Sequence, residues 1–252
     1  MKLSEGQTTQ AREVVVPGEK VADQGFKPGE GVYRDADGLY SSLLGVVERD
    51  EARSIVRVRA LRGQYIPHPE DIIIGKVIEA GLTDWEVDIN SPYMAKLDAR
   101  DAGVEVDPIT VDLRRYFDVG DYLAAKVVAF DRVTPPSLTV MGKGLGKIRG
   151  GIIVSVIPSR VPRIIGKKGS MISMLDKMLK VHLVVGQNGY VVVQGSDPDE
   201  VAFAVSIIRK IEAEAYTYGL TDRIKEILTK RYENQNGKDT TGVASQRRRC
   251  KE

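Results

Sequence analysis

Residues 161–171 read VPRIIGKKGSM, and this stretch decides the fold of the second half of the chain. Its centre, Gly166-Lys167-Lys168-Gly169, is a GxxG turn with two lysines between the glycines. A β-branched run, GGIIVSVIP, ends just before this stretch, and the segment MISMLDKMLK follows the turn. In that segment one side is apolar at helical spacing, which predicts an amphipathic helix. Two strand-like segments come next, VHLVVG and YVVVQG, joined through an Asn-Gly pair that is typical of a hairpin.

A long helix is predicted to follow the hairpin. Asp197 is a suitable N-cap, Pro198 fits the first helical position and Glu200 completes a capping box. We expect Gly219 to end this helix and Thr221 to cap a further one. The predicted order is strand, helix, GxxG loop, helix, strand, strand, helix. That order is typical of a KH domain, which we place at residues 147–233 together with the extra C-terminal helix.

The GxxG loop is the feature most suited to a chemical role. Its glycines allow a sharp turn and a close approach of nucleic acid, and the N–H groups that open the next helix favour phosphate. A KH domain clamps about four nucleotides of single-stranded RNA in this way. We therefore expect a substitution of Gly166 by Asp to weaken RNA binding with the fold intact; a purely structural turn is the alternative. The predicted RNA-binding residues of this domain are Gly166, Lys167, Lys168, Gly169, Arg160, Arg163 and Lys177.

The charge of the chain is unevenly distributed. The net charge is only +2, but residues 141–190 carry nine Lys and Arg against a single acid, a net of +8. Residues 69–140 carry seven against fourteen, a net of −7. A concentrated positive segment suits a polyanion. A solvated basic face is the alternative, although such faces usually mix both signs.

Residues 69–146 are predicted to form a five-stranded barrel. The strand segments are DIIIGKVIEA, WEVDI, MAKLDA, DYLAAKVVAF and SLTVMG. In the fourth we expect Leu123, Ala125, Val127 and Ala129 to face the interior. Five short strands of this length suit an OB fold, which binds single strands through aromatic side chains and a basic surface. The predicted RNA-binding residues of the barrel are Arg114, Arg115, Lys96, Arg100, Tyr93 and Trp85, although packing inside the barrel is an equal alternative for Trp85.

The remaining segments complete a multidomain chain of β and α/β parts. Residues 13–68 are predicted to form a small β domain with strands at 13–16, 39–48 and 54–61, whereas residues 1–12 and 234–252 read as disordered. No apolar run could span a membrane and no signal peptide is visible, so a cytoplasmic location is expected. One cysteine and two distant histidines offer no zinc or other metal site, and no nucleotide-binding or nucleophile motif is present. We therefore expect neither catalysis nor a cofactor.

Longer motifs carry a specific family resemblance. They run in order from about residue 13 to 233 and comprise VVVPGE (14–19), DIIIGKVIEAGLTDWEVDINSPYMAKL (71–97), LRRYFDVGDY (113–122), VPRIIGKKGSM (161–171), VVGQNG (184–189) and GLTDRIKE (219–226). On these residues the chain resembles the RNA-binding cap subunit of the archaeal exosome. That family joins an N-terminal β domain, an OB barrel of the ribosomal-S-one type and a KH domain.

The resemblance implies a function and a set of partners. Three copies of the cap would sit on a ring of subunits similar to ribonuclease PH, with the N-terminal β domain docked on the ring. The cap would capture single-stranded, A-rich RNA and guide its 3′ end to the pore for degradation and processing, without cutting it. A stand-alone translation or ribosome-assembly factor could use the same two RNA-binding domains and is the alternative function.

Overall fold

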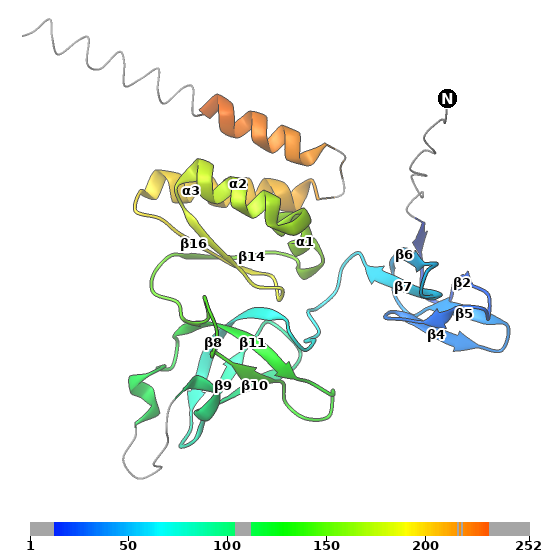
Figure 1. The fold of residues 1–252 in the computed structure, drawn as a ribbon, viewed down its shortest axis with the longest axis horizontal. Coiled ribbons are helices and arrows are strands. Elements are labelled where there is room, and N and C mark those ends of the chain that lie inside the picture. The colour runs from blue at the N-terminus through cyan, green and yellow to red at the C-terminus, as the bar shows by residue number, and fades with distance from the viewer. Residues whose placement is uncertain (1–12, 104–111, 216, 218, 232–252) are drawn as a thin grey trace, which may run out of the picture. The chain divides into compact units, whose positions relative to one another are not determined.

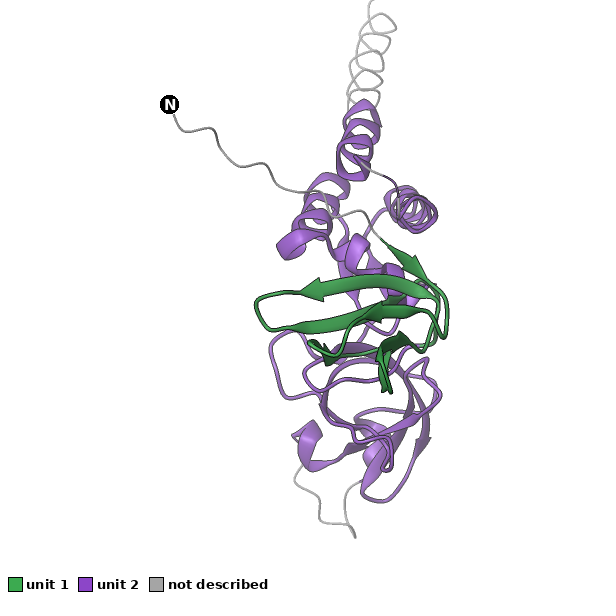
Figure 2. Cartoon of the chain, turned by 90° about the vertical axis from the view of Figure 1, so that its right-hand side faces the viewer, with its two compact units in different colours: residues 1–64 green, residues 65–252 purple. Residues whose placement is uncertain are grey.

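The computed structural model describes residues 13–103, 112–215, 217 and 219–231. The chain divides into two compact units, residues 1–64 and residues 65–252 (Figure 2). The segments predicted to be disordered, 1–12 and 234–252, lie outside the described residues. Each unit is described separately below.

The first unit consists of two small sheets. One has the order β1-β6-β7-β3 and the other β2-β5-β4. Val15, Val21, Leu39, Val56 and Val58 form its buried core. The strands are β1 (Val14–Val15), β2 (Lys20–Ala22), β3 (Lys27–Pro28), β4 (Val32–Asp35), β5 (Gly38–Ser41), β6 (Gly45–Asp50) and β7 (Ile55–Ala60).

The single strand predicted over residues 39–48 is in fact two strands, β5 and β6, which belong to different sheets. The Ser41 hydroxyl donates to the carbonyl of Leu43 at 2.6 Å, and this contact closes a turn between them. Gly45 then enters β6 so close to β7 that a Cβ atom would lie 2.4 Å from the carbonyl oxygen of Arg59. The turn and the missing side chain together allow the chain to leave one sheet and join the other.

The second unit begins with a closed barrel. Strands β8 (Ile72–Ala80), β9 (Asp84–Asp88), β10 (Met94–Asp98), β11 (Tyr122–Ala129) and β12 (Ser137–Thr139) correspond to the five predicted segments (Figure 1). Strand β12 pairs with both β10 and β11, which closes the barrel. A short sixth strand that the sequence did not predict, β13 (Gly146–Lys147), pairs with β11. The five-stranded OB-like barrel is therefore confirmed.

The interior of the barrel follows the predicted alternation in β11 as far as Val127. Leu123, Ala125 and Val127 are fully buried in the barrel core, but Ala129 is exposed. The pairing of β11 with β12 shifts register between Val127 and Ala129. A bulge adds one residue to a strand and reverses which residues face inward beyond it. The prediction that Ala129 lines the interior is therefore wrong.

The KH domain has the predicted element order. It contains β14 (Ile152–Ser155), α1 (Val161–Ile165), α2 (Ser170–Leu179), β15 (His182–Val185), β16 (Tyr190–Gln194) and α3 (Pro198–Ala213). The sheet order is β14-β16-β15. The helices cover one face of this sheet (Figure 1), and a core that includes Ile164, Leu175, Val193 and Ile208 lies between them.

The predicted start of α3 is confirmed, but the predicted end of that helix is wrong. The Asp197 carboxylate accepts from the N–H of Asp199 at 2.9 Å, which confirms the predicted N-cap of α3. However, α3 ends at Ala213, well before Gly219, and another helix spans residues 220–231. Gly219 instead lies at the start of that helix, where its carbonyl accepts from the N–H of Arg223. A glycine after an apolar stripe was thus assigned to the wrong helix end.

A buried amide joins the barrel to the KH domain. Asn188, in the β15–β16 turn, is fully buried, and its Oδ1 accepts from the N–H of Ile74 at 3.2 Å. Its Nδ2 donates to the carbonyls of Ile74 at 2.7 Å and Ile89 at 2.8 Å. Gly186 belongs to the same turn, and a Cβ there would lie 2.8 Å from the backbone nitrogen of Ile74. Because buried polar groups require partners, this junction fixes the hairpin on β8.

Candidate nucleic-acid interface

The GKKG loop lies between α1 and α2 and depends on unusual backbone angles. Gly166 has φ 75° and ψ 174°, and Gly169 has φ 77° and ψ 13°. Lys168 has φ 53° and ψ 33°, a left-handed conformation that a side chain with a Cβ adopts only at some cost. The resulting turn leaves Lys167 and Lys168 exposed to solvent. The loop therefore presents two adjacent cationic side chains on a constrained backbone.

Gly166 is required by the packing of the loop itself. A Cβ at this position would lie 2.8 Å from both the backbone nitrogen and the Cβ of Met171, in the first turn of α2. The prediction that a substitution of Gly166 by Asp leaves the fold intact is therefore wrong, because the new side chain would displace the start of the helix. Gly169 has more room, because a Cβ atom added there would have Ile172 Cγ2 as its nearest neighbour, at 3.8 Å.

The start of α2 can accept an anion. Its N-cap is Gly169, and among the described residues no side chain caps it. The first N–H groups of an uncapped helix lack intrahelical partners and carry partial positive charge. Lys167 and Lys168 have no ion pair within the part of the chain that the structure describes. The N–H of Ser170 donates to the carbonyl of Lys167, so the later N–H groups of the first turn and the two unpaired lysines form the site suited to a phosphate.

The other cationic residues predicted around the loop differ in availability. Lys177 is exposed on α2, and Arg163 is half-buried on α1. Arg160, in contrast, donates through Nη1 to the carbonyl of Glu212 at 2.9 Å. This contact ties the segment before α1 to the end of α3, so part of the Arg160 guanidinium is engaged within the domain. A contact of Arg160 with RNA stays a prediction.

The barrel gives a clear correction at Trp85. Its side chain is fully buried, and its Nε1 donates to the carbonyl of Phe117 at 2.9 Å. The Phe117 ring packs edge-on against it with centroids 5.3 Å apart. A ring without exposed surface cannot stack on a base, so the prediction of Trp85 as a stacking platform is wrong and the packed alternative holds. A buried Trp commonly pairs its indole N–H in this way.

Two further barrel candidates are engaged by neighbours. Tyr93 is half-buried and packs edge-on against Phe130, with centroids 4.7 Å apart. Lys96 forms an ion pair with Asp84 at 3.1 Å, and this hydrogen bond raises the pKa of the lysine. Its cross-strand neighbour is Glu86. Lys96 is thus paired with an acid of the neighbouring strand and is less available to a phosphate than an unpaired lysine.

The cationic residues before β11 remain accessible. Arg114 and Arg115 form a short 3₁₀ helix, which Asp112 caps by accepting from the N–H of Arg114. Both arginines are exposed, as are Tyr116 and Arg100. The connection between residues 104 and 111 lies outside the described residues. Within the barrel, these exposed residues are therefore the candidates best suited to contact a nucleic acid.

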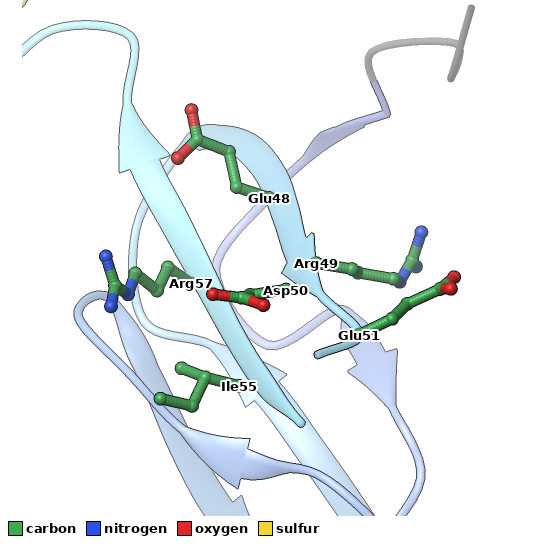
Figure 3. Close-up of a pocket in the computed structure, with 6 residues that line it drawn as sticks. All are labelled: Glu48, Arg49, Asp50, Glu51, Ile55 and Arg57. Carbon is green, nitrogen blue, oxygen red and sulfur yellow. The ribbon is translucent and has the colours of Figure 1, made fainter. Parts of the chain in front are cut away.

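A shallow pocket in the first unit has a different character (Figure 3). It lies along the β6–β7 hairpin, where Arg49 pairs with Glu13 at 2.7 Å and Arg59 pairs with Glu48 at 3.1 Å. A lining of three acids and two arginines offers little attraction to a polyanion, whereas polar side chains of this kind occur at the rim of protein interfaces. The residues that line the pocket are Glu48, Arg49, Asp50, Glu51, Ile55 and Arg57.

Comparisons with known proteins agree with this architecture. The family model described as the exosome complex exonuclease RRP4 N-terminal region matches residues 14–50, and the KH domain model matches residues 152–210. The exosome complex component Rrp4 of Thermofilum pendens is 49% identical over 224 residues, which cover 87% of this chain and 94% of that protein. The chain belongs to the Rrp4 family. The Rrp4 of Thermococcus kodakarensis is 43% identical, covering 87% of this chain and 86% of that protein.

A solved structure supports the same assignment. A crystal structure described as an exosome complex RNA-binding protein is 41% identical and has a TM-score of 0.62. The match covers 69% of this chain and 99% of that one. As an Rrp4 family member with a KH domain, the chain is a non-catalytic RNA-binding component of the exosome.

The described residues add two observations on other kinds of site. Residues 13–103, 112–215, 217 and 219–231 contain no group of three or more His, Cys, Asp or Glu side chains that could hold a metal ion. Among the helices in that part of the chain, none has the length and apolar character needed to cross a bilayer.

Sequence reasoning missed two residues of the second unit. Asn188 was interpreted only as part of a hairpin turn, yet its side chain joins two domains. Asp176 is the single acid of residues 141–190 and was given no role, although a lone acid in a basic segment is itself a signal. It is half-buried on α2, and its Oδ1 accepts from the N–H of Leu183 in β15 at 3.0 Å.

Proposed function

We propose that this Rrp4 family member caps a ring of subunits similar to ribonuclease PH, with three copies on each ring. In this role it captures single-stranded, A-rich RNA and guides the 3′ end to the pore for degradation and processing in the cytoplasm. The observation that carries the proposal is the GKKG loop, with two exposed, unpaired lysines beside an uncapped helix start. Such a site binds the phosphates of any RNA strand and does not itself account for the preference for A-rich RNA.

The junction at Asn188 supports a guiding role. A flexible linker between two RNA-binding domains would let a bound strand point in many directions. Here the buried amide hydrogen-bonds two barrel strands, β8 directly and β9 through the carbonyl of Ile89 at its end. The GKKG loop and the exposed Arg114 and Arg115 are thus held in one compact unit. A fixed geometry of this kind can direct a strand from one domain toward the other.

The first unit supports docking on a protein ring. Its pocket combines acids and arginines. Its surface exposes Val14, Val16 and Leu44, whose residue surfaces are 55%, 54% and 48% accessible. Interfaces between proteins combine apolar centres with polar rims. This proposal includes the domain limits. Residues 13–68 dock on the ring, and residues 69–146 and 147–233 contact RNA.

Affinity purification of the full chain from its native cell tests the capping proposal. We expect ribonuclease-PH-like subunits to copurify in stoichiometric amount, and a variant with Val14 and Val16 replaced by Asp to lose them. A matched control replaces exposed Val133 in the barrel by Asp. Copurification of ribosomal particles in place of ring subunits would instead favour the stand-alone translation or ribosome-assembly factor.

A further inference from the structure

A row of residues connects the GKKG loop to the edge of the KH sheet. A Cβ atom placed at Gly169, at the end of the loop, would lie 3.8 Å from Ile172 Cγ2 on α2, so Ile172 borders the loop. Asp176 lies four residues beyond Ile172, so both occupy the same face of the helix. Asp176 in turn accepts from the N–H of Leu183. Strand β15, which contains Leu183, is at the edge of the sheet order β14-β16-β15.

The dimensions of this row suit a bound nucleotide. From Gly169 to Asp176 the helix rises about 10 Å, at about 1.5 Å per residue. A KH loop clamps about four backbone nucleotides, so a base attached to a clamped phosphate can reach this distance. Ile172 is half-buried beside the loop and offers an apolar surface to the flat face of a base. Asp176 marks the far end of that surface.

Asp176 has unused hydrogen-bonding capacity. An ionised carboxylate has about four acceptor positions, and in the described part of the chain Leu183 is the one residue hydrogen-bonded to it. Burial raises the pKa of Asp176 above its ordinary value, which means that the charged form is costly at this position. A neutral Asn would satisfy Leu183 without that cost. A half-buried carboxylate in an otherwise basic segment therefore favours a role beyond capping the strand edge.

We propose that Asp176 reads a base, accepting a hydrogen bond from the exocyclic amino group of adenine or cytosine in RNA held by the GKKG loop. The carboxylate has no donor. Uracil presents a carbonyl oxygen where adenine and cytosine present an amino group, so uracil would face the carboxylate without a hydrogen bond. This inference rests on the proposed RNA contact at the loop and adds a specificity-determining residue to it.

The test compares base preference in Asp176→Asn with that in the unmodified full chain. The probes are single-stranded oligoadenylate, oligocytidylate and oligouridylate of equal length, measured in a filter-binding assay. Asn keeps an acceptor for Leu183 but adds a donor suited to uracil. We expect the preference for the amino-bearing probes over oligouridylate to fall by about tenfold, the value of one discriminating contact. The same probes are used for both proteins, so intrinsic differences among them cancel.

Two controls separate this proposal from the RNA contact on which it rests. Asp222→Asn removes a negative charge from an exposed position of the last helix and should leave the base preference unchanged. Replacing Lys167 by Gln and Lys168 by Asn should lower the affinity for all three probes by the same factor. An unchanged preference in Asp176→Asn, with the lysine variant still weak, would overturn the role of Asp176 alone. Unchanged binding in the lysine variant would overturn both.

Discussion

The Asn188 side chain hydrogen-bonds both backbone groups of Ile74, accepting from its N–H at 3.2 Å and donating to its carbonyl at 2.7 Å. The Asn188 amide thus takes the place that the backbone of a neighbouring strand would have beside Ile74 in β8. Ile74 is fully buried but does not belong to the barrel core. In the same way, Val192 of β16 is fully buried but does not belong to the KH core. Strand β8 lies against β15 and β16. The hairpin and β8 thus form a packed, hydrogen-bonded junction.

Replacing Asn188 by Ala should loosen this junction. The substitution leaves the N–H of Ile74 and the carbonyls of Ile74 and Ile89 without a side-chain partner, and unsatisfied buried groups cost about 1–3 kcal/mol each. We expect faster amide hydrogen exchange in β8 and in the β15–β16 hairpin. Asn188→Asp should be at least as disruptive, because Asp lacks the donor. Exchange equal to that of the unmodified chain would show that apolar packing alone holds the domains.

The two glycines of the loop should differ in their tolerance of a methyl group. In Gly166→Ala the new Cβ meets the backbone of Met171, whereas in Gly169→Ala it meets only the ordinary contact with Ile172. The second variant bears only the cost of a positive φ, about 1–2 kcal/mol. We expect the free energy of unfolding by urea to fall further in Gly166→Ala. The reverse order would mean that α2 shifts easily to admit a side chain.

Trp85 should affect stability without affecting RNA. Trp85→Phe removes the hydrogen bond to the carbonyl of Phe117 and leaves a small void, at a cost of about 2 kcal/mol. Affinity for single-stranded RNA in a filter-binding assay should be unchanged. If the variant remains folded but binds RNA more weakly, Trp85 contributes to RNA binding and this prediction is wrong.

Asp176 should contribute a measurable dependence of stability on pH. Its pKa is raised in the folded chain, chiefly by burial, against opposing effects of the Leu183 N–H and of His182. A folded carboxyl with a raised pKa binds more protons than the unfolded one, so the free energy of unfolding falls as pH rises between the two values. The Asp176→Asn variant has no carboxyl at this position, so its free energy of unfolding does not fall with pH for this reason. Its stability relative to the unmodified chain should therefore increase from about pH 3.8, the ordinary value, upward. A relative decrease over that range would show that the fold stabilises the charge.

Much of the fold follows from local sequence signals. The β-branched runs, the Asn-Gly turn and the Asp197-Pro198 cap each specify a local structure, and their order predicts the KH domain and the barrel. What escaped prediction depends on contacts between distant segments. The bulge after Val127 reverses the direction of Ala129, and the division of residues 39–48 into two strands depends on Gly45 approaching Arg59. No local pattern encodes these approaches.

The candidate site was predicted in part for the same reason. The GKKG loop is a local motif, and its lysines are as exposed as expected. Whether a cation is free, however, depends on neighbours that the sequence does not reveal. Arg160 bonds Glu212 and Lys96 bonds Asp84 through tertiary contacts. An aromatic residue in a strand of alternating pattern likewise fits the inner or the outer face of the barrel. The packing of Trp85 against Phe117 shows that its side chain lies on the inner face.

The salt dependence of RNA binding tests the central claim most directly. Replacing Lys167 by Gln and Lys168 by Asn, which tolerates the left-handed backbone, removes two predicted phosphate contacts. For single-stranded RNA the slope of log affinity against log salt should become less steep by about 1.4, which is about 0.7 for each contact. Lys27→Gln, at an exposed position of the first unit, should leave the slope unchanged. If the double variant keeps the original slope and affinity, RNA does not bind at the GKKG loop.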